Sequence, residues 1–161
     1  MSVCLPTKGL DDYSYRVLLA AACAAVGTLI PVAAHQAGLL DHLPDPPGGI
    51  FDSDQITESD AAHPLGIPDG VLGLGSYGIT LALALPACNC PTMRRLLALK
   101  LLADGSLAGI NVARQVISFR KLCSWCTGTA ACTGLMLLAG RKLIAEEVFA
   151  ARRDLQAGYL H

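Results

Sequence analysis

The chain has 161 residues, a formal net charge of −1, 53% hydrophobic residues and 16% charged residues. Soluble globular domains usually carry about 25% charged residues, so this chain is unusually apolar. Its basic residues form no stripe that could follow a phosphate backbone, which excludes nucleic acid as a partner. Aromatic residues make up only 5%, so the apolar content is mostly aliphatic and small, which suits packed helices better than a β-sandwich.

The first apolar stretch covers residues 17–40 and contains no charged residue. At 1.5 Å per residue, a helix of this length spans roughly 36 Å and can cross the hydrocarbon core of a bilayer. Its end shows no small-residue cleavage site. We therefore expect a retained membrane helix, kinked at Pro31, rather than a signal peptide.

The second apolar stretch, residues 66–87, follows an acidic, proline-rich loop over residues 41–65. Pro68 suits the first position of a helix, and Asp69 suits the positive end of the helix dipole. The run over residues 73–78 matches the G-x-G-x-x-G pattern of dinucleotide sites. Because this run lies inside a membrane-length stretch and follows no strand, we expect its glycines to serve helix packing instead.

The third stretch, residues 95–119, is apolar except for Lys100, Asp104, Asn111 and Arg114. Lys100 and Asp104 are four residues apart and share a helix face, so we expect them to pair. A lone charge at mid-bilayer costs about 2.5–3.5 kcal/mol on insertion scales. We therefore expect Lys100 near the inner membrane interface and Arg114 near the outer one. The fourth stretch covers residues 123–146 and precedes a polar tail.

The distribution of Lys and Arg predicts the orientation, because cytoplasmic loops carry an excess of basic residues. With the N-terminus inside, nine of the 12 basic residues lie inside, namely Lys8, Arg16, Arg94, Arg95, Lys100, Arg141, Lys142, Arg152 and Arg153, and three lie outside, namely Arg114, Arg120 and Lys121. The sequence thus predicts one domain over residues 1–161. The expected fold is an all-α, integral-membrane four-helix bundle with a short polar extracytoplasmic loop after the first helix. We expect a multi-pass protein of the cell inner membrane with both termini cytoplasmic.

A Cys-Ser-Trp-Cys motif, Cys123 to Cys126, opens the fourth stretch. Two thiols three residues apart can close into a reversible disulfide on the first turn of a helix. The helix dipole and the cations Arg120 and Lys121 favour the thiolate that disulfide exchange requires. The structural alternative is a pair of reduced cysteines that only pack a membrane helix.

A second pair, Cys88 and Cys90, falls at the inner end of the second helix. A C-x-C pair can bind a metal, but two ligands are too few for a closed site. We therefore expect reduced thiols and no metal, and a metal-handling membrane protein stands as a further functional alternative.

Four features follow one another in the order seen in a known family. A G-I-P-x-x-x-x-G sequence runs from Gly66 to Gly73, and Ser59 precedes it by seven residues. Gln115 precedes the Cys-x-x-C by eight residues, and Cys123 opens the last helix. In order and spacing these features resemble homologues of vitamin K epoxide reductase, over residues 59–140 and a matching first span.

The resemblance implies a four-helix bundle around a quinone pocket that transfers two electrons between a dithiol and a quinone of the ubiquinone, menaquinone or phylloquinone type. It implies that Cys126 faces the quinone and that Cys123 faces a thioredoxin-like extracytoplasmic thiol partner. The candidate quinone-binding residues are Ser59, as a hydrogen-bond donor to a carbonyl, Asp69, at the pocket mouth, and Trp125, as an interfacial anchor that walls the site. Membrane lipid is the remaining expected partner.

Two departures from the family shape the functional hypothesis. Residues 41–65 contain no cysteine, although the family usually carries a relay pair in this loop. Ala130 stands four residues after Cys126, where the vertebrate enzyme has a tyrosine, so we expect quinone reduction rather than epoxide reduction. The leading hypothesis is a membrane thiol:quinone oxidoreductase that supports disulfide formation. The missing relay favours an alternative, a non-catalytic four-helix membrane subunit that keeps the fold and has lost the relay.

Overall fold

The computed structural model describes residues 10–87 and 89–158, so Lys8 and Cys88 lie outside it. Its elements in chain order are α1 (Asp12–Gln36), α2 (Ser53–Thr57), η1 (Asp60–Ala62), η2 (Pro64–Gly66), α3 (Asp69–Ala87), α4 (Pro91–Arg114), η3 (Gln115–Phe119) and α5 (Ser124–Gly158). Across the described residues no strand forms, and an isolated β-bridge joins Phe51 to Leu122. The predicted all-α class is therefore confirmed for this part of the chain.

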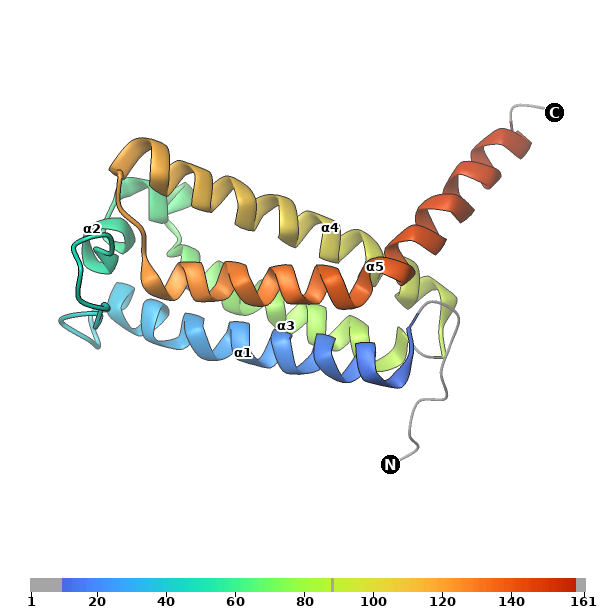
Figure 1. The fold of residues 1–161 in the computed structure, drawn as a ribbon, viewed down its shortest axis with the longest axis horizontal. Coiled ribbons are helices and arrows are strands. Elements are labelled where there is room, and N and C mark those ends of the chain that lie inside the picture. The colour runs from blue at the N-terminus through green and yellow to red at the C-terminus, as the bar shows by residue number, and fades with distance from the viewer. Residues whose placement is uncertain (1–9, 88, 159–161) are drawn as a thin grey trace.

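The long helices α1, α3, α4 and α5 lie side by side, and α2 with the neighbouring turns covers one end (Figure 1). We call this end the α2 end. Helix α1 packs against α3 and α5, and α4 packs against the same two helices. At the opposite end the last turns of α5 extend away from the other helices (Figure 1).

Local capping, rather than hydropathy, sets the ends of the first two long helices. Helix α1 begins at Asp12 instead of residue 17, because the side chain of Asp11 accepts a hydrogen bond from the Ser14 N–H at 2.7 Å. It ends at Gln36 instead of residue 40. Helix α3 begins at Asp69 instead of residue 66, since Gly66 has a left-handed φ of +78° and closes η2.

The last two long helices also have other bounds than the apolar stretches that predicted them. Helix α4 starts at Pro91 instead of residue 95, and proline is favoured at the first helical position because it has no N–H to satisfy. Helix α5 continues beyond residue 146 to Gly158, so the predicted polar tail is helical. Residues 115–119 form the π-helical turn η3 rather than the last turn of an α-helix.

Within the part of the chain that the structure describes, three helical segments are long and apolar enough to cross a membrane, namely Asp12–Gln36, Asp69–Ala87 and Pro91–Phe119. These correspond to the first three predicted spans. Helix α5 is not among them, so the fourth span stays a prediction. Among the described residues, the bundle interior contains fully buried aliphatic side chains from all four long helices, such as Leu18, Ala84, Leu97 and Met136.

Close contact between α1 and α3 depends on one glycine. A Cβ atom at Gly70 would lie 2.9 Å from the backbone nitrogen of Ala33, which is shorter than side-chain atoms tolerate. Small residues allow helix backbones to approach in this way.

The predicted ion pair between Lys100 and Asp104 is present. The Nζ atom of Lys100 lies 2.5 Å from both carboxylate oxygens of Asp104. The same Nζ atom donates to Ser76 and Thr80, which lie halfway along α3. The pair therefore lies halfway along the bundle, where a buried carboxylate and two hydroxyls solvate the ammonium. The position of Lys100 near the inner membrane interface stays a prediction.

Candidate active site

The two cysteines of the Cys-x-x-C motif lie at the start of α5, at the α2 end. Cys123 directly precedes the helix and Cys126 lies in its first turn. The backbone N–H of Cys126 donates to the Sγ atom of Cys123 at 3.1 Å, and both cysteines are free thiols. The side chains are buried, with 0% exposure for Cys123 and 9% for Cys126. The motif thus places both sulfur atoms on one helical turn.

Gln115, in the π-helical turn η3, fixes the first cysteine. Its Oε1 atom accepts a hydrogen bond from the backbone N–H of Cys123 at 2.9 Å. The residue is only 2% exposed, and its Nε2 atom has no hydrogen-bond partner within the part of the chain that the structure describes. Leaving a buried amide unpaired costs about 1–3 kcal/mol, and single π-turns are frequent at functional sites. Gln115 is therefore a functional residue candidate in its own right.

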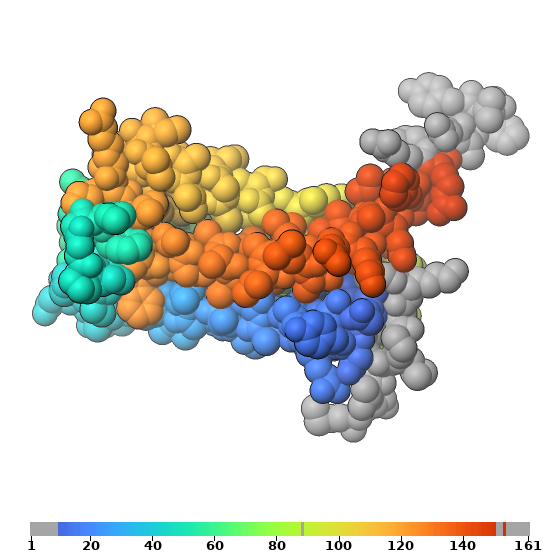
Figure 2. Space-filling view, in the orientation of Figure 1, coloured from blue at the N-terminus to red at the C-terminus, as the bar shows by residue number. Residues whose placement is uncertain are grey.

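Residues 41–58, which we call the cap segment, cover Cys123. Asp45 is the centre of this cover, because its carboxylate accepts hydrogen bonds of 2.6 Å from the N–H and the hydroxyl of Ser53 and from the hydroxyl of Ser124. The N–H of Ser124 in turn donates to the Ser53 hydroxyl at 3.1 Å. In Figure 2 the cap segment packs directly over the start of α5. A partner protein cannot touch Cys123 while this segment is in place.

Backbone hydrogen bonds hold the cap segment from a second side. The N–H of Asp52 donates to Leu122 O at 2.9 Å, and the N–H of Leu122 donates to Ile50 O at 3.0 Å. The indole Nε1 of Trp125 donates to Pro44 O at 3.1 Å. The part of the cap segment between residues 44 and 53 is thus joined to residues 122–125 by several hydrogen bonds.

Hydrogen bonds also lower the pKa values of Asp45 and Cys123 at the α2 end. Burial raises the pKa of Asp45, but donors from Ser124 and Ser53 outweigh it and leave this pKa below its usual value. The pKa of Cys123 is lowered chiefly by a hydrogen bond from the Cys126 thiol. Burial raises this pKa, and a hydrogen bond from Ser53 lowers it further. Cys123 is therefore the thiol that ionises more easily than an ordinary cysteine.

Cys126 lines a cavity of about 340 Å³ that is bounded by α1, α3, α4 and α5, and Cys123 is not among its described lining residues. Its apolar walls include Leu72, Leu107 and Ile110, whose side chains are 44%, 63% and 56% exposed. Since these walls are also part of the outer surface of α3 and α4, the cavity opens sideways between these two helices. Its polar lining residues are Asp69, Ser76, Tyr77, Asp104, Asn111, Arg114 and Thr129.

The structure brings only part of the predicted site together. Asp69 lines the cavity with Cys126, and its Oδ1 atom accepts a hydrogen bond from Gln36 at 2.8 Å. Ser59 donates to Ile56 O at 2.6 Å and borders an adjoining hollow of about 10 Å³, which shares Asp69 and Arg114 with the cavity. Trp125 bonds to the cap segment and is not among the described residues that line the cavity. Ser59 and Trp125 thus lie near the thiols without facing the same space as Cys126.

Several residues at the site were not among the predicted ones. Gln36 joins three elements, since its Nε2 atom donates to Thr57 O at 3.2 Å and to Asp69, and its Oε1 atom accepts from the Gly70 N–H at 3.0 Å. Asp104 and Asn111, which line the cavity, are seven residues apart and therefore share one face of α4. This spacing was visible in the sequence, where both residues interrupted an apolar run.

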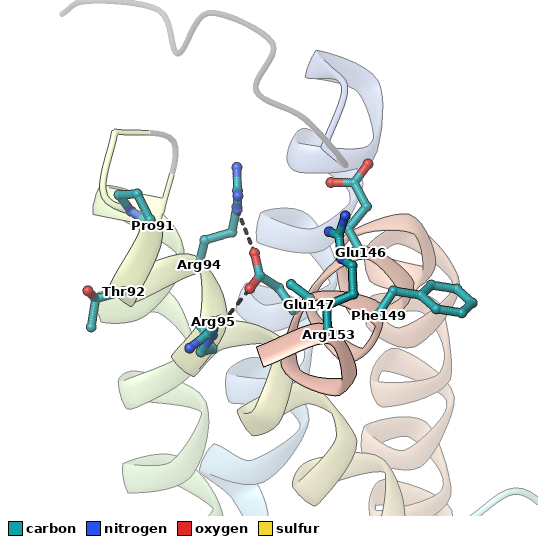
Figure 3. A pocket seen from close by; sticks show the side chains of 9 residues that line it. Pro91, Thr92, Arg94, Arg95, Glu146, Glu147, Phe149 and Arg153 are labelled. Atoms are coloured by element: carbon teal, nitrogen blue, oxygen red, sulfur yellow. Dashed lines mark hydrogen bonds and ion pairs between the residues drawn. The ribbon is translucent and has the colours of Figure 1, made fainter. Parts of the chain in front are cut away.

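A second hollow, of about 810 Å³, lies at the opposite end of the bundle between the start of α4 and α5 (Figure 3). There Glu147 accepts from Arg94 Nε at 2.9 Å and pairs with Arg95 Nε at 3.5 Å. No cysteine is among its described lining residues.

The metal-handling alternative gains no support from the described residues. Within residues 10–87 and 89–158, no group of three or more His, Cys, Asp or Glu side chains is arranged to hold a metal ion. Of the two cysteines behind this alternative, Cys88 lies outside the described residues and Cys90 is the N-cap of α4.

Comparison with known proteins gives one match. The model of the vitamin K epoxide reductase family matches residues 16–139, which is more than half of the chain. No curated protein and no solved structure matches the chain. The matched range starts in α1 and ends in α5, so it includes the cavity and both cysteines of the motif.

Proposed function

The chain belongs to the vitamin K epoxide reductase family, and on this premise we propose that it is a membrane thiol:quinone oxidoreductase. Its Cys123–Cys126 dithiol passes two electrons to a quinone of the ubiquinone, menaquinone or phylloquinone type and thereby supports disulfide formation. The family and three apolar helices make it a membrane protein. We further propose that it is a four-helix, multi-pass protein of the cell inner membrane with both termini cytoplasmic.

One observation carries the proposal: Cys126 shares a laterally open cavity with polar side chains, and Cys123 lies one turn away outside that cavity. A volume of about 340 Å³ is within the range of small-molecule pockets, which bind a ligand between apolar walls and orient it with a few polar groups. A flat, lipid-soluble ring fits these walls, and the opening between α3 and α4 gives it a route from the bilayer.

The two cysteines divide the chemistry. Cys126 faces the quinone. Once the cap segment opens, Cys123 exchanges with a thiol partner, for which an extracytoplasmic thioredoxin-like protein is the expected class. In the net reaction the two S–H bonds break, one S–S bond forms, and two electrons and two protons reduce the quinone to its hydroquinone. The partner then restores the dithiol by giving up its own two electrons and two protons. The lowered pKa of Cys123 supports its role in the exchange step, which needs a thiolate.

The test is quinone reduction by purified protein in detergent, with dithiothreitol as electron donor and ubiquinone-1 as acceptor, followed by ultraviolet absorbance. We expect Cys126→Ser to lower the rate at least 100-fold, because no dithiol remains to form the disulfide. Cys23→Ser is the matched control, since Cys23 is exposed on α1 and we expect its loss to leave the rate unchanged. A Cys126→Ser variant with the rate of the unaltered protein would rule the mechanism out.

The alternative of a non-catalytic membrane subunit also has an observation in its favour. Cys123 is 0% exposed beneath a cap segment that contains no cysteine to relay electrons. Thiol trapping in intact cells separates the two functions. The oxidoreductase cycles between a dithiol and a Cys123–Cys126 disulfide and becomes fully reduced when quinone is depleted, whereas the subunit stays reduced in either condition.

A further inference from the structure

Halfway along α3 and α4, four polar side chains form one hydrogen-bonded cluster: Ser76, Thr80, Lys100 and Asp104. Ser76 and Thr80 each donate to the Asp104 carboxylate at 3.0 Å, and the Lys100 ammonium lies 2.5 Å from both of its oxygens. Asp104 is only 5% exposed. Ionisable residues within membrane helices are costly and rare, and they typically mark ligand or ion sites. This cluster is therefore a candidate ligand-contacting site.

The cluster has one side toward the cavity and one side away from it. Ser76 and Asp104 line the same cavity as Cys126, whereas Thr80 and Lys100 are not among its described lining residues. Asp69 lines that cavity too, two helical turns before Ser76, or about 10 Å along α3. The cavity thus has polar groups near the α2 end and again at its deep end, with apolar walls between them.

We infer that the Ser76 hydroxyl donates a hydrogen bond to one carbonyl oxygen of the quinone, and that Lys100 is a positioning residue behind it. This inference rests on the proposed function and adds a residue to the same cavity. The Lys100 Nζ atom donates to Ser76 Oγ at 2.8 Å, so it occupies a lone pair of that oxygen and strengthens the hydroxyl as a donor.

Turning the Ser76 proton toward a ligand leaves no buried group unpaired. The oxygen that Ser76 gives up, Asp104 Oδ1, still accepts from Lys100 at 2.5 Å. The other oxygen, Asp104 Oδ2, also accepts from Lys100 at 2.5 Å. The cluster can therefore release one hydroxyl proton at little cost, which is what a pre-organised donor to a carbonyl requires.

Equilibrium binding of ubiquinone-1 tests the inference without turnover. Every sample carries Cys126→Ser, so no dithiol reacts, and binding to detergent-purified protein is measured by titration calorimetry. We expect Ser76→Ala to raise the Kd about five- to tenfold, as loss of one hydrogen bond predicts. Thr80→Val is the matched control, because it removes a hydroxyl from the same cluster on the side away from the cavity, and we expect its Kd to stay within about twofold.

A second variant tests the role of Lys100 without leaving a buried unpaired charge that could unfold the protein. Lys100→Met combined with Asp104→Leu removes both charges together, so no uncompensated charge stays buried. We expect its Kd to rise as for Ser76→Ala, and adding Ser76→Ala to it to have less effect than in the unaltered cluster. The infrared carbonyl band of bound ubiquinone-1 gives a further readout. This band is shifted by the hydrogen bond and should return toward its free position in Ser76→Ala.

The outcomes separate the inference from the proposed function. If Ser76→Ala and Thr80→Val bind ubiquinone-1 with the same Kd and carbonyl band, the cluster is only structural and the inference is wrong, although quinone reduction by the unaltered protein would still support the function. If no variant binds ubiquinone-1 and the unaltered protein does not reduce it, both are wrong.

Discussion

Two carboxylates, Asp45 and Asp104, hold together different regions of the protein, and each accepts hydrogen bonds from two hydroxyl groups. Asp45 lies half-buried in the cap segment and is held by Ser53 and Ser124. Asp104 lies in the middle of the bundle and in addition pairs with Lys100 at 2.5 Å. Near water, hydrogen bonds from hydroxyl and amide groups are enough to stabilise a carboxylate. Inside a membrane span, a counter-ion is needed as well to neutralise its charge.

The comparison predicts that the two carboxylates respond differently to loss of charge. Around Asp45 the side chains are neutral, so removing its charge weakens only local contacts of the cap segment. Around Asp104 the removal leaves an ammonium inside the bundle. Variants of the two residues therefore test whether hydrogen bonds alone stabilise the region around Asp45 and whether charge balance stabilises the region around Asp104.

The largest effect is expected from Asp104→Leu. It leaves the Lys100 ammonium without its counter-ion in a buried position, which costs about 3–5 kcal/mol of unfolding free energy. The measurement is denaturant unfolding in detergent micelles. The control is Asp104→Leu combined with Lys100→Met, which we expect to recover most of that loss. Equal destabilisation by the single and the double variant would show that the charge balance does not matter here.

An intermediate effect is expected from Asp45→Asn, which weakens the hydrogen bonds to Ser53 and Ser124 and loosens the cap segment. We expect about fivefold faster alkylation of Cys123 by a maleimide at neutral pH, since loss of a hydrogen bond of about 1 kcal/mol raises the open population by that factor. Asp41→Asn is the control, because Asp41 is an exposed residue of the same segment. Unchanged alkylation in Asp45→Asn would show that other contacts close the segment.

Acid should open the same segment in the unaltered protein. The pKa of Asp45 is lower in the folded state than in the unfolded state, so its stabilising contribution is complete above the ordinary carboxyl value of about 3.9 and is lost as the pH falls through the lower folded value. The lowered pKa of Asp54, where hydrogen bonding to Leu43 N and His42 outweighs burial, acts in the same direction. Hydrogen exchange of residues 41–58 should show protection at pH 5 and its loss in stronger acid, and protection that persists in acid would contradict this account.

The smallest effect concerns the charge of Cys123. Its pKa is lowered chiefly by the Cys126 thiol, so Cys126→Ala should move that pKa back toward the ordinary cysteine value. The pH profile of Cys123 alkylation measures this, and we expect its midpoint to rise. Asp45→Asn serves as the background in both samples, so that access to Cys123 is the same. A midpoint that falls or stays constant would mean that another group sets the pKa.

Hydropathy predicted the long helices but not their ends. Residues 17–40 were apolar enough to reveal α1, whereas its start depends on the Asp11 cap and the start of α3 on the left-handed Gly66. Such ends are decided by single hydrogen bonds and φ angles, which the average hydropathy of a stretch does not report. The π-helical geometry of residues 115–119 was equally invisible.

The site was predictable where one local motif defines it and not where distant segments meet. The Cys-x-x-C spacing placed both thiols on one helical turn, and Asp69 lines the cavity with Cys126. Asp45 looked like any other acidic residue of a polar loop, because its partner Ser124 is 79 residues away in sequence. Ser76 likewise gains its significance only from its neighbours on α4.

The sideways opening of the cavity has a consequence for how tightly a substrate must bind. Its mouth is formed by Leu72, Leu107 and Ile110, side chains that a bilayer would meet as hydrocarbon. A hydrophobic substrate partitions into that phase and is far more concentrated there than in the aqueous volume. Modest intrinsic affinity is then enough for saturation, and the rate of turnover follows the mole fraction of substrate in the lipid rather than the total amount added.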